Sequence, residues 1–186
     1  MKKSVCVVLL FCLAPITSIA QDAPETPEMP KPTKEHEWLL KFVGEWEMES
    51  EVKMDPSGPP VAATATESVR SLGGFWIIAE GETKAMGMSF SYIMSLGYDP
   101  DKKRYVGTWI DSMNGYLWVY DGSPDSTGKI LTLEAEGPCP TKPGEMSKFK
   151  DITEFKSPDH RVFTSMMQGE DGEWTTFVTG HARRKK

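Results

Sequence analysis

About ten strand-length segments, separated by turn signals, follow one another along most of this 186-residue chain. Residues 46–54 show the pattern most clearly, because apolar or neutral residues occupy one parity and charged residues occupy the other. An alternation with a period of two is typical of a strand with one dry and one wet face. A long series of such strands predicts a sandwich or a closed barrel, and a barrel has an interior in which a molecule can bind.

The gaps between these segments are short and rich in Gly, Pro, Asn and Asp, which favour turns. Asn114-Gly115 and Asp171-Gly172 each predict a tight hairpin. Short connections cannot join parallel neighbours, so we expect an antiparallel meander. Thr33 is expected to cap a short helix over residues 34–42, which ends at Gly44. The expected strands span residues 46–54, 61–72, 75–84, 88–96, 104–113, 116–120, 130–136, 146–156, 161–168 and 174–183.

The N-terminus has the features of a secretory signal peptide over residues 1–20. Two lysines follow the first Met, and residues 5–13 form an apolar run that is too short to cross a bilayer. Ser18-Ile19-Ala20 fits a small-x-small cleavage site. We therefore expect export, to the periplasm or the extracellular space, after cleavage near Ala20.

The remaining chain divides into a linker and one domain. Residues 21–33 carry four prolines among acidic residues and are expected to form an extended tether, which leaves one domain over residues 34–186. Cleavage leaves 19 basic against 27 acidic residues, a net charge of −8 that disfavours nucleic acid and anionic membranes as partners. Cys139 is the single cysteine that remains after cleavage, so no intramolecular disulfide is expected. The stability of the fold then depends on its hydrophobic core. No membrane span is expected after the signal peptide.

The helix at residues 34–42 and the Gly44-Glu45-Trp46 motif after it resemble the closed end of lipocalin-like, or calycin, barrels. In that family the Trp closes the barrel and often packs under an Arg of the last strand. The resemblance implies that Arg183 or Arg184 is this partner. We therefore predict an all-β, antiparallel, up-and-down lipocalin-like barrel of about ten strands with a short N-terminal helix.

A second resemblance is carried by Gly97-Tyr98-Asp99, by residues 86–90 and by the stretch from Thr108 to Met113 (Thr-Trp-Ile-Asp-Ser-Met). These motifs are similar to a bacterial family of small, often secreted proteins that is catalogued as a domain of unknown function. The likeness extends over most of residues 36–184. It implies a fold and no particular activity.

No motif of a known catalytic or cofactor site is present in the sequence. The chain has no Gly-x-Ser-x-Gly elbow, no phosphate loop, no dinucleotide fingerprint and no Cys-x-x-Cys pair. His36, His160 and His181 lie in three different kinds of segment, so the spacing predicts no metal site. His181 near the end of the last expected strand resembles the haem ligand of nitrobindin-like calycins. That match is one residue long, and we expect no cofactor.

The residues of one parity in several expected strands are aromatic or Met, with one carboxylate among them. Such a lining suits an apolar ligand pocket, and it equally suits a packed core. The candidate ligand-binding residues on this inward face are Met48, Met88, Phe90, Tyr92, Trp109, Asp111, Met113 and Trp118.

Asp111 and Asp151 are expected on inward faces, where a carboxylate needs a partner. Either could orient a ligand or act as an acid/base, or bond structurally to a loop amide, a Tyr hydroxyl or an Arg. Three functions follow. The first is binding of a small apolar or amphiphilic molecule by an exported barrel. The second is a weak acid/base enzyme centred on Asp111, and the third is a structural or protein-binding barrel with a filled core.

Overall fold

The computed structural model describes residues 28–53 and 58–186, and the folded unit spans Pro32–Lys186. The predicted signal peptide, residues 21–27 of the predicted linker, and Met54 lie outside the described residues. A short helix, α1 (Lys34–Leu39), starts after Thr33 as predicted and continues into a 3-10 turn (Leu40–Phe42). No helix in the described part of the chain is both long and apolar enough to cross a membrane.

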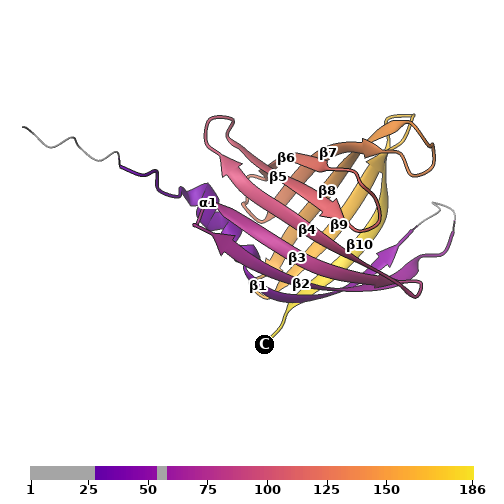
Figure 1. The fold of residues 1–186 in the computed structure, drawn as a ribbon, viewed down its shortest axis with the longest axis horizontal. Coiled ribbons are helices and arrows are strands. Elements are labelled where there is room, and N and C mark those ends of the chain that lie inside the picture. Colours follow the sequence, from indigo (N-terminus) through magenta and orange to yellow (C-terminus); the bar gives the residue numbers. More distant parts are fainter. Residues whose placement is uncertain (1–27, 54–57) are drawn as a thin grey trace, which may run out of the picture. The chain divides into compact units, whose positions relative to one another are not determined.

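Ten antiparallel strands form a closed barrel in which each strand pairs with the next, and the first pairs with the last (Figure 1). This confirms the predicted fold class. The strands are β1 (Gly44–Val52), β2 (Val61–Leu72), β3 (Trp76–Ala85), β4 (Met88–Asp99), β5 (Arg104–Asp111), β6 (Trp118–Pro124), β7 (Ile130–Pro138), β8 (Met146–Ser157), β9 (His160–Gln168) and β10 (Trp174–Arg184).

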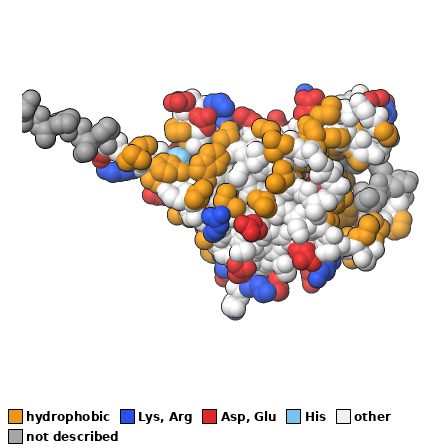
Figure 2. Space-filling model, in the orientation of Figure 1, with side chains coloured by type: hydrophobic (Ala, Val, Ile, Leu, Met, Phe, Trp, Pro, Cys, Tyr) orange, Lys and Arg blue, Asp and Glu red, His pale blue; other side chains and the backbone are white. Residues whose placement is uncertain are grey.

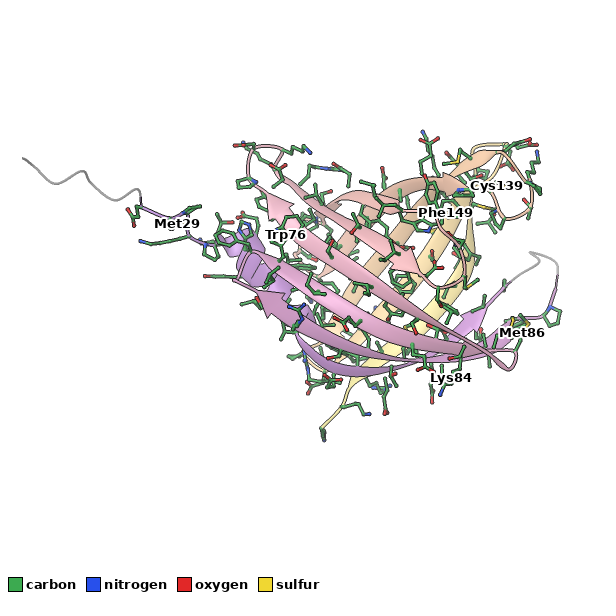
Figure 3. All side chains as sticks on the ribbon, viewed as in Figure 1. Met29, Trp76, Lys84, Met86, Cys139 and Phe149 are labelled. Carbon is green, nitrogen blue, oxygen red and sulfur yellow. The ribbon has the colours of Figure 1, made fainter. Side chains whose placement is uncertain are left out.

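The predicted alternation sets which side chains enter the barrel. In β1 the buried Trp46 and the half-buried Met48 alternate with the exposed Glu45, Glu47 and Glu49. The outer face is not wholly polar, and Figure 2 shows hydrophobic side chains scattered over it. Trp76, which Figure 3 labels, is one of these and is 38% exposed. Such scattered apolar residues are normal on a protein surface.

Tight packing closes the barrel at the end where α1 lies. Trp46 is 1% exposed, and its Nε1 donates a hydrogen bond of 2.7 Å to the Phe42 carbonyl. The guanidinium of Arg184 lies 4.3 Å from the Trp46 ring centre and donates to the carbonyls of Val43 and Lys41. Of the two expected partners of Trp46, Arg184 therefore takes the role. Other nearly inaccessible side chains at this end are Leu39, Phe42, Ile77, Leu96, Tyr105 and Leu131.

Two turns differ from the prediction. Asn114-Gly115 lies in a six-residue connection between β5 and β6, and Asp171-Gly172 lies in a five-residue connection between β9 and β10, so neither forms a two-residue hairpin. The side-chain oxygens of Asp111 and Asn114 accept hydrogen bonds from nearby backbone amides, which stabilises the first of these longer loops. A two-residue hairpin instead joins β3 and β4 at Met86-Gly87, where φ is 52° and 75°. Two positive φ angles in succession are typical of a type I′ turn.

A candidate ligand site in the open half of the barrel

A first polar network crosses the interior just above Trp46. Arg161 on β9 donates to the carboxylate of Glu67 on β2, and the Tyr92 hydroxyl of β4 donates to the same carboxylate at 3.0 Å. Strands β2 and β9 are separated in the sheet by β1 and β10, so this ion pair spans the interior. The guanidinium of Arg161 also lies 4.6 Å from the Trp46 ring centre, which places the network directly on the closed end.

A second polar network includes Ser165, which lies four residues after Arg161 on β9. Asp151 of β8 accepts hydrogen bonds from the Tyr120 hydroxyl of β6, at 2.6 Å, and from the Ser165 hydroxyl of β9. Desolvation raises the pKa of Asp151, although the two hydroxyl donors oppose the shift. Desolvation and the nearby Asp151 carboxylate raise the pKa of Tyr120 well above its ordinary value. We call the two networks together the polar belt; its members are Glu67, Arg161, Tyr92, Asp151, Tyr120 and Ser165.

Aromatic side chains line the interior from the polar belt toward the open end. Trp109 of β5 stacks on Tyr92, with ring centres 4.0 Å apart and planes 17° apart. Trp118 of β6 meets Phe149 of β8 edge to face, with ring centres 5.0 Å apart. Trp109 and Trp118 are only half-buried although both project inward. We call Met48, Phe90, Trp109, Trp118 and Phe149 the aromatic wall.

Glycines let three large side chains lie flat against the sheet. A Cβ at Gly81 would overlap the Tyr92 ring, and a Cβ at Gly137 would overlap the Trp118 ring. A Cβ at Gly180 would lie 2.8 Å from the sulfur of Met48. Because these positions carry no side chain, the neighbouring groups rest on the backbone and do not reach across the interior.

The structure places the predicted ligand-binding residues in two groups. Met48, Phe90, Tyr92, Trp109 and Trp118 project into the barrel, from fully buried to half-buried. Met88 and Met113 are 62% and 68% exposed. Met88 follows the Met86-Gly87 hairpin, whose tip is labelled in Figure 3, and Met113 lies beyond the end of β5, so both sit at the rim and not on the interior wall.

Asp111 is half-buried at the end of β5 and is held by its own loop. Its carboxylate accepts hydrogen bonds from Trp109 Nε1 at 3.2 Å, from the Met113 amide at 2.8 Å and from the Asn114 amide at 3.2 Å. This is the arrangement expected of a structural carboxylate that anchors a loop. It corresponds to the loop-amide alternative considered from the sequence.

Sequence reasoning missed the ion pair of Glu67 and Arg161. The alternation itself carried a signal, because Glu67 has the inward parity of Ala63, Ala65 and Val69 in β2. A charged side chain at an inward position needs an oppositely charged partner inside the barrel, and that partner can lie on a different strand. Identifying that partner from sequence would need the relative placement of strands that are 94 residues apart.

His181 lies on the outer face, since it is exposed and alternates with the buried Gly180 and Ala182. Its Nδ1 is 3.1 Å from Nε2 of His160, and the two rings stack with centres 5.4 Å apart. This position faces away from the interior that the haem hypothesis would require. Among the described residues, no group of three or more His, Cys, Asp or Glu side chains has the arrangement of a metal site.

A depression of about 420 Å³ lies over strands β1 to β4 and is rich in carboxylates. Most of its lining residues are on the outer face, and Glu67 and Tyr92 of the polar belt line it as well. Within it, Glu45 accepts a 2.6 Å hydrogen bond from Ser68, and Glu82 accepts one of the same length from Ser89. Carboxylates bonded to neighbouring hydroxyls are ordinary features of a wet sheet face. The interior therefore remains the candidate site.

Comparison with solved structures supports the barrel. Rv2717c from M. tuberculosis has a TM-score of 0.59 at 14% identity, over 84% of this chain and 100% of that one. The S-type phycobiliprotein lyase CPES from Guillardia theta has a TM-score of 0.53 at 14% identity, over 83% and 99% of the two chains. Likeness at such low identity concerns the fold alone. No curated protein gave a significant match.

The sequence itself identifies the family. Residues 31–184 match the family described as "Protein of unknown function (DUF1579)", so the match covers nearly the whole barrel and its N-terminal helix. The chain therefore belongs to the DUF1579 family.

Proposed function

We propose that the protein binds a small apolar or amphiphilic molecule in the open half of its barrel. The observation that carries the proposal is that four of the five members of the aromatic wall keep part of their surface exposed, whereas Phe149 is buried. Met48, Phe90, Trp109 and Trp118 are all half-buried, whereas the inward residues near α1 are almost inaccessible. Apolar surface that water reaches inside a concave wall is the surface that a ligand stabilises by covering it.

The glycines on the wall support the same proposal. Trp118 rests on Gly137 and Met48 rests on Gly180, which leaves their exposed faces turned to the interior. Large rings placed flat against a wall offer broad contact at a low cost in conformational entropy. A core that is simply packed would have no need of wide apolar faces in contact with water.

The proposal includes export and requires no cofactor. The signal-like residues 1–20 support action in the periplasm or beyond. Within the ten strands, no His or Cys has inward parity beyond the polar belt, so a ligand there would be held by apolar contacts and hydrogen bonds. The negative net charge of the mature chain argues against nucleic acid as the partner.

Titration with the neutral hydrophobic dye N-phenyl-1-naphthylamine tests the proposal. The folded protein is expected to bind the dye saturably, with enhanced dye fluorescence and a change in Trp emission. Trp118→Ala should weaken binding by about tenfold, since a lost ring face removes on the order of 1.4 kcal/mol of contact. Trp76→Ala is the matched control, because this Trp is partly exposed on the outer face. Equal effects of the two variants, or no saturable binding, would contradict the proposal.

A further inference from the structure

The interior of the barrel has an uneven set of charges. In the described residues, the charged side chains that project inward above Trp46 are Glu67, Arg161, Asp151 and, at the rim, Asp111. They comprise three acids and one base. The excess of negative charge acts strongly on a ligand in this space, because water screens charges poorly there.

The single interior base is already fully engaged. Arg161 is paired with Glu67, and its guanidinium lies between two aromatic partners, 4.6 Å from the Trp46 ring centre and 5.2 Å from that of Phe42. Releasing it to a carboxylate or phosphate would leave Glu67 without its cation in the interior, which is strongly unfavourable. The interior therefore has no free cation to hold an anionic ligand.

Among the described residues, neither Asp111 nor Asp151 has a cation as partner, and Asp151 is the one that lies below the rim, on β8. Its contacts are the hydroxyls of Tyr120 and Ser165, each of which donates one hydrogen bond, and a carboxylate has about four acceptor sites. Asp151 keeps part of its surface accessible. Desolvation raises the pKa of this carboxyl group, and a nearby positive charge would oppose that shift by stabilising the ionised form.

The wall above Asp151 suits the same kind of ligand. Phe149 precedes Asp151 by two residues on β8, and Trp118 stands in the same relation to Tyr120 on β6, so both rings lie one layer above the carboxylate. Faces of Trp and Phe attract cations through their quadrupoles. Loops 139–145 and 169–173 at the open end carry four acids and one lysine, and that lysine is paired with Glu170. This excess of acids would draw cations toward the mouth.

We propose that the ligand is an amphiphile with a positively charged head, such as a long-chain amine or quaternary ammonium compound. Its head lies beside Asp151, and its apolar tail lies along the aromatic wall toward the open end. This inference rests on the proposed function and adds the charge of the ligand to it. Fatty acids and other anionic amphiphiles of the same length are excluded by the unpaired acids and by the engaged Arg161.

Three amphiphiles with the same ten-carbon chain test the inference: decyltrimethylammonium, decanol and decanoate. Each is used below its micelle concentration to displace N-phenyl-1-naphthylamine from the full-length mature protein. The cation is expected to bind at least about tenfold more tightly than decanoate, with decanol between them. Asp151→Asn should reduce the ratio of cation to anion affinity severalfold. Glu136→Gln on the outer side of β7 removes one negative charge as well, and it should leave the ratio unchanged.

The outcomes separate the two proposals. If decanoate binds as tightly as the cation, the inference about the head group is wrong and the binding function stands. If the dye binds saturably but the ratio is unchanged in a folded Asp151→Asn protein, the assignment to Asp151 is wrong. If neither the dye nor any of the three amphiphiles binds, both the inference and the proposed function are wrong. Should Asp151→Asn not fold, the comparison of the three amphiphiles on the parent protein still decides the charge of the ligand.

Discussion

The two ends of this barrel are both lined with aromatic rings, but the rings are enclosed at one end and partly exposed at the other. At the closed end Trp46 is 1% exposed, donates its indole hydrogen to a backbone carbonyl and lies against the guanidinium groups of Arg161 and Arg184. At the open end Trp118 rests on Gly137 and Trp109 stacks on Tyr92, and both Trp side chains stay half-buried. The polar belt separates the two regions.

The comparison shows how one residue type performs two tasks in one fold. A Trp that is enclosed on all sides contributes its whole surface to stability. A Trp with one free face contributes less to stability and can offer that face to a ligand. Residual exposure of inward-facing residues, and not their composition, therefore distinguishes the structural end from the candidate binding end.

The largest expected effect is the loss of Trp46. Trp46→Ala should lower the free energy of unfolding by about 3–5 kcal/mol, because it empties a tightly packed site and removes the ring that the guanidinium groups of Arg161 and Arg184 contact. Trp118→Ala should lower the same free energy by only about 1–2 kcal/mol, because the half-buried Trp118 side chain contributes less buried apolar surface than Trp46 does. Urea denaturation followed by circular dichroism measures both. Equal losses would remove the distinction between the two ends.

The next effect concerns the boundary between the two regions. Arg161→Met should destabilise the protein by about 2–4 kcal/mol, because it leaves Glu67 in the interior without its cation. The two side chains are only 10% and 11% exposed, so water screens the remaining charge little. Adding Glu67→Gln to Arg161→Met should recover part of the stability, since no uncompensated charge then remains. A double variant that is less stable than Arg161→Met would show that the pair does not span the interior as described.

A smaller effect depends on pH and on Asp151. Its pKa in the folded protein is raised above the unfolded value of about 3.8, so the unfolded chain releases this proton first as pH rises. Asp151 therefore makes folding less favourable between about pH 4 and its folded pKa, by up to about 1.4 kcal/mol per pH unit. The stability of Asp151→Asn relative to the parent should rise over that interval and then level off. A difference that does not change from pH 4 to 8 would mean that water reaches this carboxylate freely.

The smallest effects are expected at the rim. Met88→Ser and Met113→Ser should change the free energy of unfolding by less than about 0.5 kcal/mol, because both side chains are mostly exposed. Dye affinity should change by less than about twofold, in contrast to Trp118→Ala. Urea denaturation and dye titration of the same preparations check both expectations. A large loss of dye affinity would extend the binding surface from the aromatic wall to the rim.

Local patterns predicted the strands, because the alternation of polar and apolar residues can be recognised from neighbouring residues alone. The second expected strand coincides with β2 (Val61–Leu72), and the parity of Trp46 placed it correctly inside. The parity of the last strand also separates Arg184, which reaches Trp46, from Arg183, which is exposed. The turns were less predictable, since the side-chain hydrogen bonds of Asp111 made a longer loop where Asn-Gly alone favours a hairpin.

The candidate site was predictable only in part for a related reason. The sequence identified Trp109, Trp118 and Tyr92 as inward-facing, because parity fixes the face of each strand. Depth along the barrel axis depends on the register between strands, and this decides that Met88 and Met113 lie at the rim. Contacts across the interior, such as that between Glu67 and Arg161, depend on closure of the whole sheet, so parity can mark Glu67 as inward-facing but cannot identify its partner.

The pairing of β1 with β10 also has a consequence for how the chain reaches this structure. It joins Trp46 to Arg184, so the last hydrogen-bonded seam forms between strands from opposite ends of the folded unit. Contacts between such distant residues make folding slow, and the unpaired edges of β1 and β9 stay available to other chains until the seam forms. A nascent chain that still lacks Trp174–Arg184 cannot close its sheet, so the barrel is not protected from aggregation until β10 has been synthesised.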